Sequence, residues 1–210
     1  MKPWKNCLAA ILLSLLTLPV CASASAQGIL IVGDSISAAF GLELERGWVS
    51  LLQARLRAQA AEMPVVNASV SGDTTAGGLA RLPRLLQEHE PDLVVIELGG
   101  NDGLRGLAPD KMQQNLSAMV DAAHAAGAEV LLLGMRIPPN YGVRYTEAFE
   151  RVFRELGEQP EVALVPFVLE GVAGVPQLMQ ADGIHPNADG QPGILENVWP
   201  LISDWLETQP

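Results

Sequence analysis

Cysteine is almost absent from this chain, and its two copies, Cys7 and Cys21, lie near the N-terminus. The sequence after residue 26 can therefore contain no disulfide, no thiol nucleophile and no cysteine metal ligand, even in an oxidising compartment. Cys21 could serve as a lipidation site, but Pro19 and Val20 replace the small residues expected before a lipidated cysteine. We therefore interpret Cys21 as ordinary leader sequence.

Positive charge is also scarce. Thirteen Lys and Arg residues stand against 24 Asp and Glu, which gives a formal net charge of -11. Binding to nucleic acid and to anionic membranes depends on clustered Lys and Arg, so we expect neither as a partner. The acidic balance is consistent with solubility and identifies no substrate. No pattern in the sequence indicates an oligomer, and we expect a monomer.

The first 26 residues have the order of a secretory signal peptide. Lys2 and Lys5 precede the apolar stretch Leu8–Leu18, and the small residues of positions 24–26 end the segment. The apolar stretch has 11 residues, which is short of the ~20 that a membrane-spanning helix needs and disfavours an uncleaved anchor. We therefore expect cleavage after residue 26 and export to the periplasm or the medium. One mature domain over 27–210, without stable membrane insertion, is the expected product.

After the leader, short apolar runs alternate with longer amphipathic stretches. Continuous apolar runs are typical of strands that are buried on both faces of a parallel sheet. The expected strands are Gly28–Gly33, Val65–Ala68, Leu93–Leu98, Val130–Met135 and Val162–Val165. Apolar residues at helical spacing predict helices over Gly47–Ala60, Ala76–Glu88, Pro109–Ala126, Tyr145–Leu156 and Gly193–Leu206. The alternation predicts an α/β fold, a single three-layer α/β/α domain on a mainly parallel five-stranded sheet.

Histidine is the usual base that activates a serine, and the chain has only three. His89 and His124 lie near the ends of predicted helices, where a solvated histidine that complements the helix dipole is expected. His185 instead lies in an irregular loop, three residues after Asp182. That spacing lets Asp182 accept the Nδ1 hydrogen and orient the ring, which leaves Nε2 to take a proton. Taken alone, the same motif also fits an ordinary surface loop.

Ser35 directly follows the first predicted strand, in Gly33-Asp34-Ser35. Ligands bind beyond the carboxyl ends of parallel strands, and a serine at such a turn can project its hydroxyl into a site. The segment is not the Gly-x-Ser-x-Gly elbow of the α/β-hydrolases, because Ser37 stands where the second glycine is required. The alternative interpretation of Ser35 is a helix N-cap.

An acyl transfer at Ser35 needs hydrogen-bond donors for the oxyanion of its tetrahedral intermediate. Gly72 follows the second predicted strand, and Asn101 carries a side-chain amide beyond the end of the third. Both residues also suit ordinary turns. Four apolar residues after the third and fourth strands could line an acyl pocket, although they could equally pack their own loops: Leu104, Leu107, Ile137 and Tyr141.

Four blocks of the chain resemble those of the SGNH (GDSL) hydrolase family and occur in the same order. They are Gly33-Asp34-Ser35, Gly72, Gly99-Gly100-Asn101-Asp102 and Asp182-Gly183-Ile184-His185-Pro186. The segment 67–74, which contains Gly72, is similar to the bacterial thioesterase I/protease I/lysophospholipase subfamily, also described as arylesterases.

The resemblance implies a flavodoxin-like sheet and hydrolysis of small acyl esters or thioesters through an acyl-serine, without a metal or organic cofactor. It implies catalytic roles for Ser35, Asp182 and His185. It also implies an oxyanion hole formed by the backbone N–H groups of Ser35 and Gly72 and by the Asn101 side chain.

Two other site chemistries would use residues of the same loops. A dinuclear metallophosphoesterase fits poorly, because only one of the three histidines lies in a plausible site. Its candidate ligands are Asp34, Asp73, Asn101, Asp102 and His185. A nucleotide-binding P-loop over 72–78 is rejected, because Gly78 stands where the lysine is required. An exported flavodoxin-like binding module is the non-enzyme alternative, because fold does not imply function.

Overall fold

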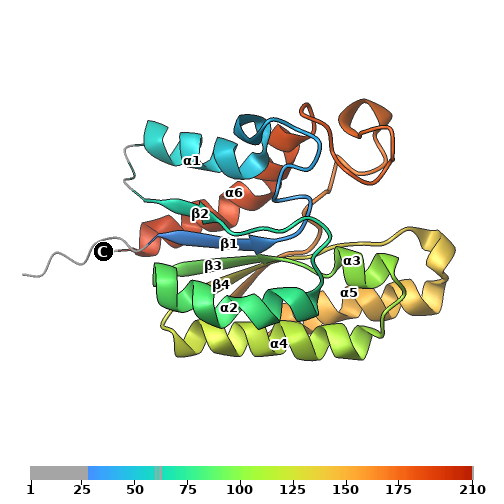
Figure 1. The fold of residues 1–210 in the computed structure, drawn as a ribbon, viewed down its shortest axis with the longest axis horizontal. Helices are drawn as coiled ribbons and strands as arrows, with labels where there is room; N and C mark the ends of the chain where they lie inside the picture. Colours follow the sequence, from blue (N-terminus) through green and yellow to red (C-terminus); the bar gives the residue numbers. More distant parts are fainter. Residues whose placement is uncertain (1–27, 60, 62, 210) are drawn as a thin grey trace, which may run out of the picture.

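A five-stranded parallel sheet forms the middle layer of the molecule (Figure 1). The computed structural model describes residues 28–59, 61 and 63–209, so the predicted leader, 1–26, lies outside the described residues. The strand order is β2-β1-β3-β4-β5, and every neighbouring pair is parallel. The strands are β1 (Ile29–Gly33), β2 (Val65–Asn67), β3 (Leu93–Glu97), β4 (Glu129–Leu133) and β5 (Val162–Val165). The predicted fold class is confirmed, and each predicted strand is present with ends displaced by no more than two residues.

The two central neighbours β1 and β3 are buried along their whole length. This burial explains why their sequences are continuous apolar runs without polar alternation. Glu97, the last residue of β3, is the exception, because it is a carboxylic acid with no exposed surface. Its side chain contacts the segment that carries Ser35, through bonds to Asp34 and Ser37.

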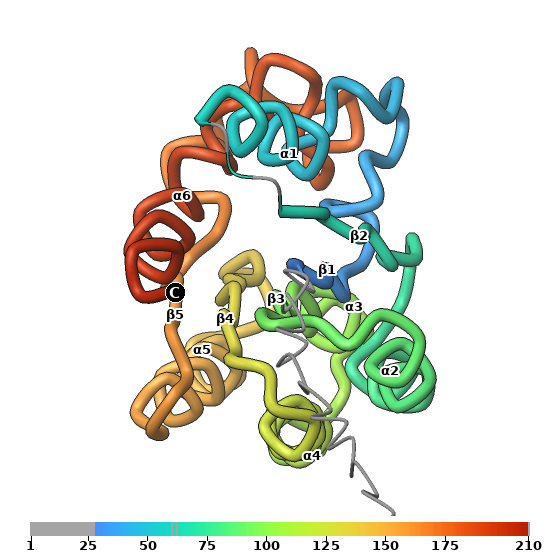
Figure 2. Tube along the Cα trace, turned by 90° about the vertical axis from the view of Figure 1, so that its left-hand side faces the viewer, coloured from blue at the N-terminus to red at the C-terminus, as the bar shows by residue number. Residues whose placement is uncertain are grey.

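Helices cover both faces of the sheet (Figure 2). On one face α1 (Trp48–Ala58) packs against α6 (Gln191–Thr208). The opposite face is covered by α2 (Thr75–His89), α4 (Pro109–Ala125) and α5 (Val143–Gly157). These five are the helices predicted from the sequence. The short helices η1 (Leu44–Arg46), α3 (Gly100–Leu104), η2 (Pro139–Tyr141) and η3 (Pro176–Leu178) were not predicted, because three to five residues show no helical periodicity.

The carboxyl ends of all five strands share one edge of the sheet, because the strands are parallel. In Figure 1 this edge lies on the side of α3, away from the C-terminus. The polar loops singled out in the sequence begin at this edge, so they face a common region. Over the described residues, no helix is long and apolar enough to cross a membrane.

Candidate active site

Ser35 lies at the start of a tight turn that follows β1. The Asp34 carbonyl accepts a hydrogen bond from the Ala38 N–H at 3.0 Å, and the Ser35 carbonyl accepts one from the Phe40 N–H at 3.1 Å. The buried Asp34 side chain also accepts from the Ile36 N–H at 3.1 Å. These bonds fold the chain back as soon as the strand ends, and they leave Ser35 half-buried at the edge of the sheet.

The structure brings Ser35, His185 and Asp182 into one hydrogen-bonded chain. His185 Nε2 lies 2.9 Å from Ser35 Oγ, and His185 Nδ1 lies 2.7 Å from Asp182 Oδ2. With the proton of the neutral imidazole on Nδ1, the ring donates to the carboxylate and accepts from the serine hydroxyl. Residues separated by 150 positions are thus placed in the geometry that activates a serine nucleophile.

The loop that carries His185 is held by Asp182. The second oxygen of this carboxylate accepts hydrogen bonds from the backbone N–H groups of Ile184 at 2.9 Å and His185 at 3.0 Å. Gly183 permits the tight turn, because its φ of +68° lies in the left-handed region that favours glycine. The bonds from the His185 ring, the His185 N–H and the Ile184 N–H lower the pKa of Asp182 to about 2. The carboxylate therefore remains charged beside the imidazole in neutral solution.

Two residues that no motif indicated fasten this loop to the turn that follows Ser35. Gln180 donates from Nε2 to the carbonyls of Phe40, at 2.8 Å, and Pro186, at 3.1 Å. The Phe40 ring lies against the His185 ring with 4.6 Å between centroids. The turn after Ser35 therefore contacts the loop that carries His185 at two points besides the Ser35–His185 bond.

Two buried carboxyl groups, those of Asp34 and Glu97, lie next to the turn that carries Ser35. Glu97 Oε2 accepts from the Ser37 hydroxyl at 2.8 Å and from the N–H groups of Ser37 and Asp34 at 3.2 and 3.3 Å. Burial, followed by the nearby Asp34 charge, raises the pKa of Glu97 well above its usual value. Burial also raises the pKa of Asp34 to about 6, although bonds from Ile36 and Asn101 oppose the shift. Through these bonds the end of β3 is connected to the turn that follows β1.

The three predicted oxyanion donors differ in their surroundings. Within the part of the chain that the structure describes, the N–H groups of Ser35 and Gly72 donate no hydrogen bond. Asn101 borders the same cavity as Ser35, and its Nδ2 donates to Asp34 Oδ2 at 2.9 Å, which leaves the second amide hydrogen available. Gly72 lies on the exposed β2–α2 loop with a φ of +79°, and its carbonyl accepts from Arg105 at 2.8 Å.

A cavity of about 580 Å³ opens beside Ser35 and His185. Of the four predicted pocket residues, Leu104 and Ile137 line it, whereas Leu107 and Tyr141 do not. Leu107 is exposed to solvent. The Tyr141 hydroxyl donates to the Leu104 carbonyl at 2.7 Å, so Tyr141 joins η2 to α3 behind the cavity lining. Six further apolar residues, which follow β4 and β5 and which no sequence pattern indicated, form one wall of the cavity: Met135, Phe167, Leu169, Ala173, Met179 and Ile184.

The residues of the metallophosphoesterase alternative have other partners. Asp73 forms an ion pair with Arg81 at 2.8 Å. Asp102 accepts from the Thr75 hydroxyl at 2.6 Å and from its N–H at 2.9 Å, so it joins α3 to the start of α2. No group of three or more His, Cys, Asp or Glu residues that could hold a metal ion occurs among the described residues.

Comparison with known proteins identifies the family of this chain. Residues 31–191 match the model of the GDSL-like lipase/acylhydrolase family. The chain is 60% identical to Esterase TesA of Pseudomonas aeruginosa, with 96% of both chains covered. It is 46% identical to Thioesterase 1/protease 1/lysophospholipase L1 of Escherichia coli, over 89% of this chain and 85% of the relative.

A solved esterase structure is also similar to this chain in both fold and sequence. The psychrotrophic esterase EstA from Pseudoalteromonas sp., inhibited by monoethylphosphonate, superposes with a TM-score of 0.82 at 45% identity, covering 87% of this chain and 100% of that one. The resemblance stated from four short sequence blocks is thus confirmed over most of the chain. The protein belongs to the GDSL-like lipase/acylhydrolase family.

Proposed function

We propose that this protein is a serine hydrolase that cleaves carboxylic esters and thioesters through an acyl intermediate on Ser35. One observation carries the proposal. Ser35, His185 and Asp182 are linked by consecutive hydrogen bonds at the border of the apolar cavity. The esterase and thioesterase names of the relatives support the same reaction class.

The reaction begins with proton transfer from Ser35 to His185. As the hydroxyl oxygen attacks the acyl carbonyl carbon, Nε2 of the imidazole takes the hydroxyl proton, and the ring becomes positively charged. Asp182 stabilises this charge through the bond at Nδ1, since its low pKa keeps the carboxylate ionised. The same imidazolium then donates its Nε2 proton to the departing alcohol or thiol.

Charge that develops on the carbonyl oxygen needs donors that are already in place. The free N–H of Ser35 and the second amide hydrogen of Asn101 serve this purpose at the cavity, and the Gly72 N–H supplies the third donor. His185 then activates a water molecule, which attacks the acyl carbon and releases the acid from Ser35. This sequence of steps uses only side chains and backbone groups of the protein.

The cavity indicates the part of the substrate that it accommodates. Its lining is mostly apolar, with polar groups gathered at Ser35, Asn101 and His185. Such a cavity suits an acyl chain with its ester or thioester group at the polar end. Aryl esters, acyl thioesters and lysophospholipids share this arrangement.

Replacement of Ser35 tests the assignment. Ser35→Ala is expected to abolish hydrolysis of p-nitrophenyl esters and covalent labelling by a fluorophosphonate, because both reactions need the Ser35 oxygen. The thermal unfolding temperature is expected to change little, since Ser35 is only half-buried and lies outside the apolar core. Ser117→Ala is the matched control, because Ser117 is also half-buried but lies on α4, and this variant should retain full activity.

The same assay separates the alternatives. A metallophosphoesterase would lose activity in a chelator and would not be labelled at Ser35. A binding module without catalysis would neither hydrolyse the ester nor take up the label. Substantial hydrolysis by Ser35→Ala would remove the serine from the mechanism.

We also propose that residues 1–26 act as a signal peptide and that the enzyme works outside the cytoplasm, in the periplasm or the medium. The support is the order of charged, apolar and small residues in this segment. Mass spectrometry of the protein exported from cells that express the full chain is expected to show an N-terminus at Gln27. Recovery of uncleaved chain in the membrane fraction would contradict the proposal.

A further inference from the structure

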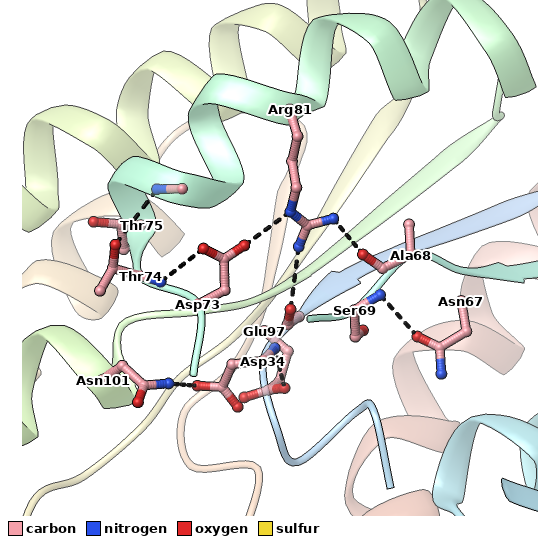
Figure 3. A network of polar contacts seen from close by, with 12 residues as sticks. Asp34, Asn67, Ala68, Ser69, Asp73, Thr74, Thr75, Arg81, Glu97 and Asn101 are labelled. Carbon is pink, nitrogen blue, oxygen red and sulfur yellow. Dashed lines mark hydrogen bonds and ion pairs between the residues drawn. The ribbon is translucent and has the colours of Figure 1, made fainter. Parts of the chain in front are cut away.

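We propose that Arg81 is a positioning residue, which holds the loop carrying Gly72 against the turn carrying Ser35. The inference deepens the proposed function and rests on it, because it concerns how the oxyanion donor Gly72 is held at a fixed position relative to Ser35. Arg81 lies on α2 and touches neither Ser35 nor His185, and no motif singled it out. Its guanidinium makes three contacts with two segments, the end of β1 and the β2–α2 loop. Figure 3 shows the contacts with Ala68 and Asp73 of the loop.

One contact reaches the strand that leads to the nucleophile. The Arg81 guanidinium donates to the carbonyl of Gly33 at 3.2 Å, and Gly33 is the last residue of β1. Only Asp34 separates this carbonyl from Ser35. The same carbonyl also accepts from the Val70 N–H at 3.0 Å, so the β2–α2 loop and the guanidinium share one anchor.

The other two contacts flank Gly72. A second nitrogen of the guanidinium donates to the Ala68 carbonyl, before the glycine. The third donates to the Asp73 carboxylate, directly after it, at 2.8 Å. The Asp73 N–H in turn donates to the Val70 carbonyl at 3.0 Å, which closes a turn with Gly72 in its third position. Both ends of the segment that presents the Gly72 N–H are therefore bound to one side chain.

The ion pair between Arg81 and Asp73 is partly buried, and the adjacent helix leaves space for it. The side chains of Arg81 and Asp73 are 22% and 13% exposed, so the pair is shielded from solvent and restrains both partners more than an exposed pair would. Asp73 Oδ1 rests on the first turn of α2, where a Cβ on Gly77 would clash with it. The glycine thus provides the space in which the carboxylate meets Arg81.

The planar guanidinium is suited to this task, because its donors point in fixed directions toward three acceptors. A lysine carries its donors on a single nitrogen at the end of a flexible chain, so it lacks this fixed arrangement. Loss of the clamp frees the Gly72 loop relative to Ser35, and displacement of a catalytic group by about 1 Å can cost ~10²-fold in rate. The loss should be seen in the rate constant and not in substrate binding, because the apolar cavity does not involve Arg81.

The experiment compares Arg81→Gln with the wild-type enzyme on a p-nitrophenyl ester. We expect kcat to fall by about 10- to 100-fold while KM changes by less than about threefold. Active sites are counted by labelling with a fluorophosphonate until the reaction is complete. The variant should reach the wild-type number of labelled sites, only more slowly, so that kcat per labelled site is reduced. A purely structural role would reduce the number of sites and leave kcat per site unchanged.

Arg84→Gln is the matched control, because it removes the same charge from the same helix. Its side chain is 78% exposed and forms an ion pair with Glu88, so kcat should stay within about twofold of wild type. Arg81→Lys should give an intermediate kcat. Should Arg81→Gln fail to fold, Asp73→Asn is measured in the same way and is expected to lower kcat per site by a smaller factor.

Wild-type kcat per labelled site in Arg81→Gln, or in Asp73→Asn, would overturn the positioning role, as would a change confined to KM. These outcomes leave the proposed function standing, because the wild-type enzyme still hydrolyses the ester and Ser35→Ala does not. An inactive wild-type enzyme, or an active Ser35→Ala, would instead overturn the proposed function and the positioning role with it.

Discussion

Asp182 performs two tasks with the two oxygens of one side chain. Oδ1 accepts the N–H groups of Ile184 and His185 and so fixes the loop, whereas Oδ2 accepts the Nδ1 hydrogen of His185 and so fixes the tautomer. The two tasks can be separated, because an asparagine retains an oxygen for the loop but replaces the other acceptor with a donor.

The Asp182→Asn variant is therefore expected to fold like the wild type but to have a much lower kcat. The amide hydrogen facing Nδ1 would favour the tautomer with its proton on Nε2, which cannot accept the Ser35 proton, and we expect kcat to fall by about 10²–10⁴. Steady-state kinetics together with the unfolding temperature would measure both effects. A variant that keeps more than a tenth of wild-type kcat would show that the carboxylate is not needed to orient His185.

At the same scale, the sequence could predict residues that belong to motifs and little else. Ser35, Asn101 and His185 stand directly after strands or in a short loop, where local order reveals them. Arg81 and Glu97 could not be found in this way, because each acquires its role from partners 8 to 63 positions away. A buried acid at a strand end was the one available signal, since Glu97 interrupts an otherwise apolar run.

At the scale of elements, periodicity predicted everything that spans several turns or a whole strand. The five strands and five long helices form because packing in three layers buries their apolar faces against one another. The prediction failed for segments whose structure depends on the surrounding fold, such as α3 and the stretch between β5 and α6. That stretch forms much of the cavity wall, so the pocket could be predicted only in part, through Leu104 and Ile137.

At the scale of the whole molecule, two buried acids make the stability of the fold depend on pH. Both Glu97 and Asp34 have pKa values raised by burial, so the folded protein holds protons that the unfolded chain releases. Their contribution to the free energy of unfolding is complete below about pH 4 and is lost as the pH rises through the folded-state values. The low pKa of Asp182 acts oppositely, but only in acid below its usual value.

Glu97→Gln should flatten this dependence. The variant lacks one of the two titrating groups, so above the usual carboxyl pKa its unfolding free energy should fall less steeply with pH than that of the wild type, by at most about 1.4 kcal/mol per pH unit for the one proton removed. Urea unfolding at several pH values would show the two curves converging or crossing as the pH rises. Glu88→Gln, at a side chain that is 52% exposed, should instead run parallel to the wild type.

The direction of α6 has a practical consequence. The helix begins beside the loop that carries His185 and ends at Thr208. This end lies near the edge where the strands begin, because the Trp205 indole donates to Glu129, the first residue of β4, at 3.1 Å. The end of α6 therefore lies at the edge of the sheet opposite the strand ends from which the Ser35 turn begins. Attached to a solid support through a tag that follows residue 210, the enzyme would present its cavity to the solution, and immobilisation would leave the path of the ester to Ser35 open.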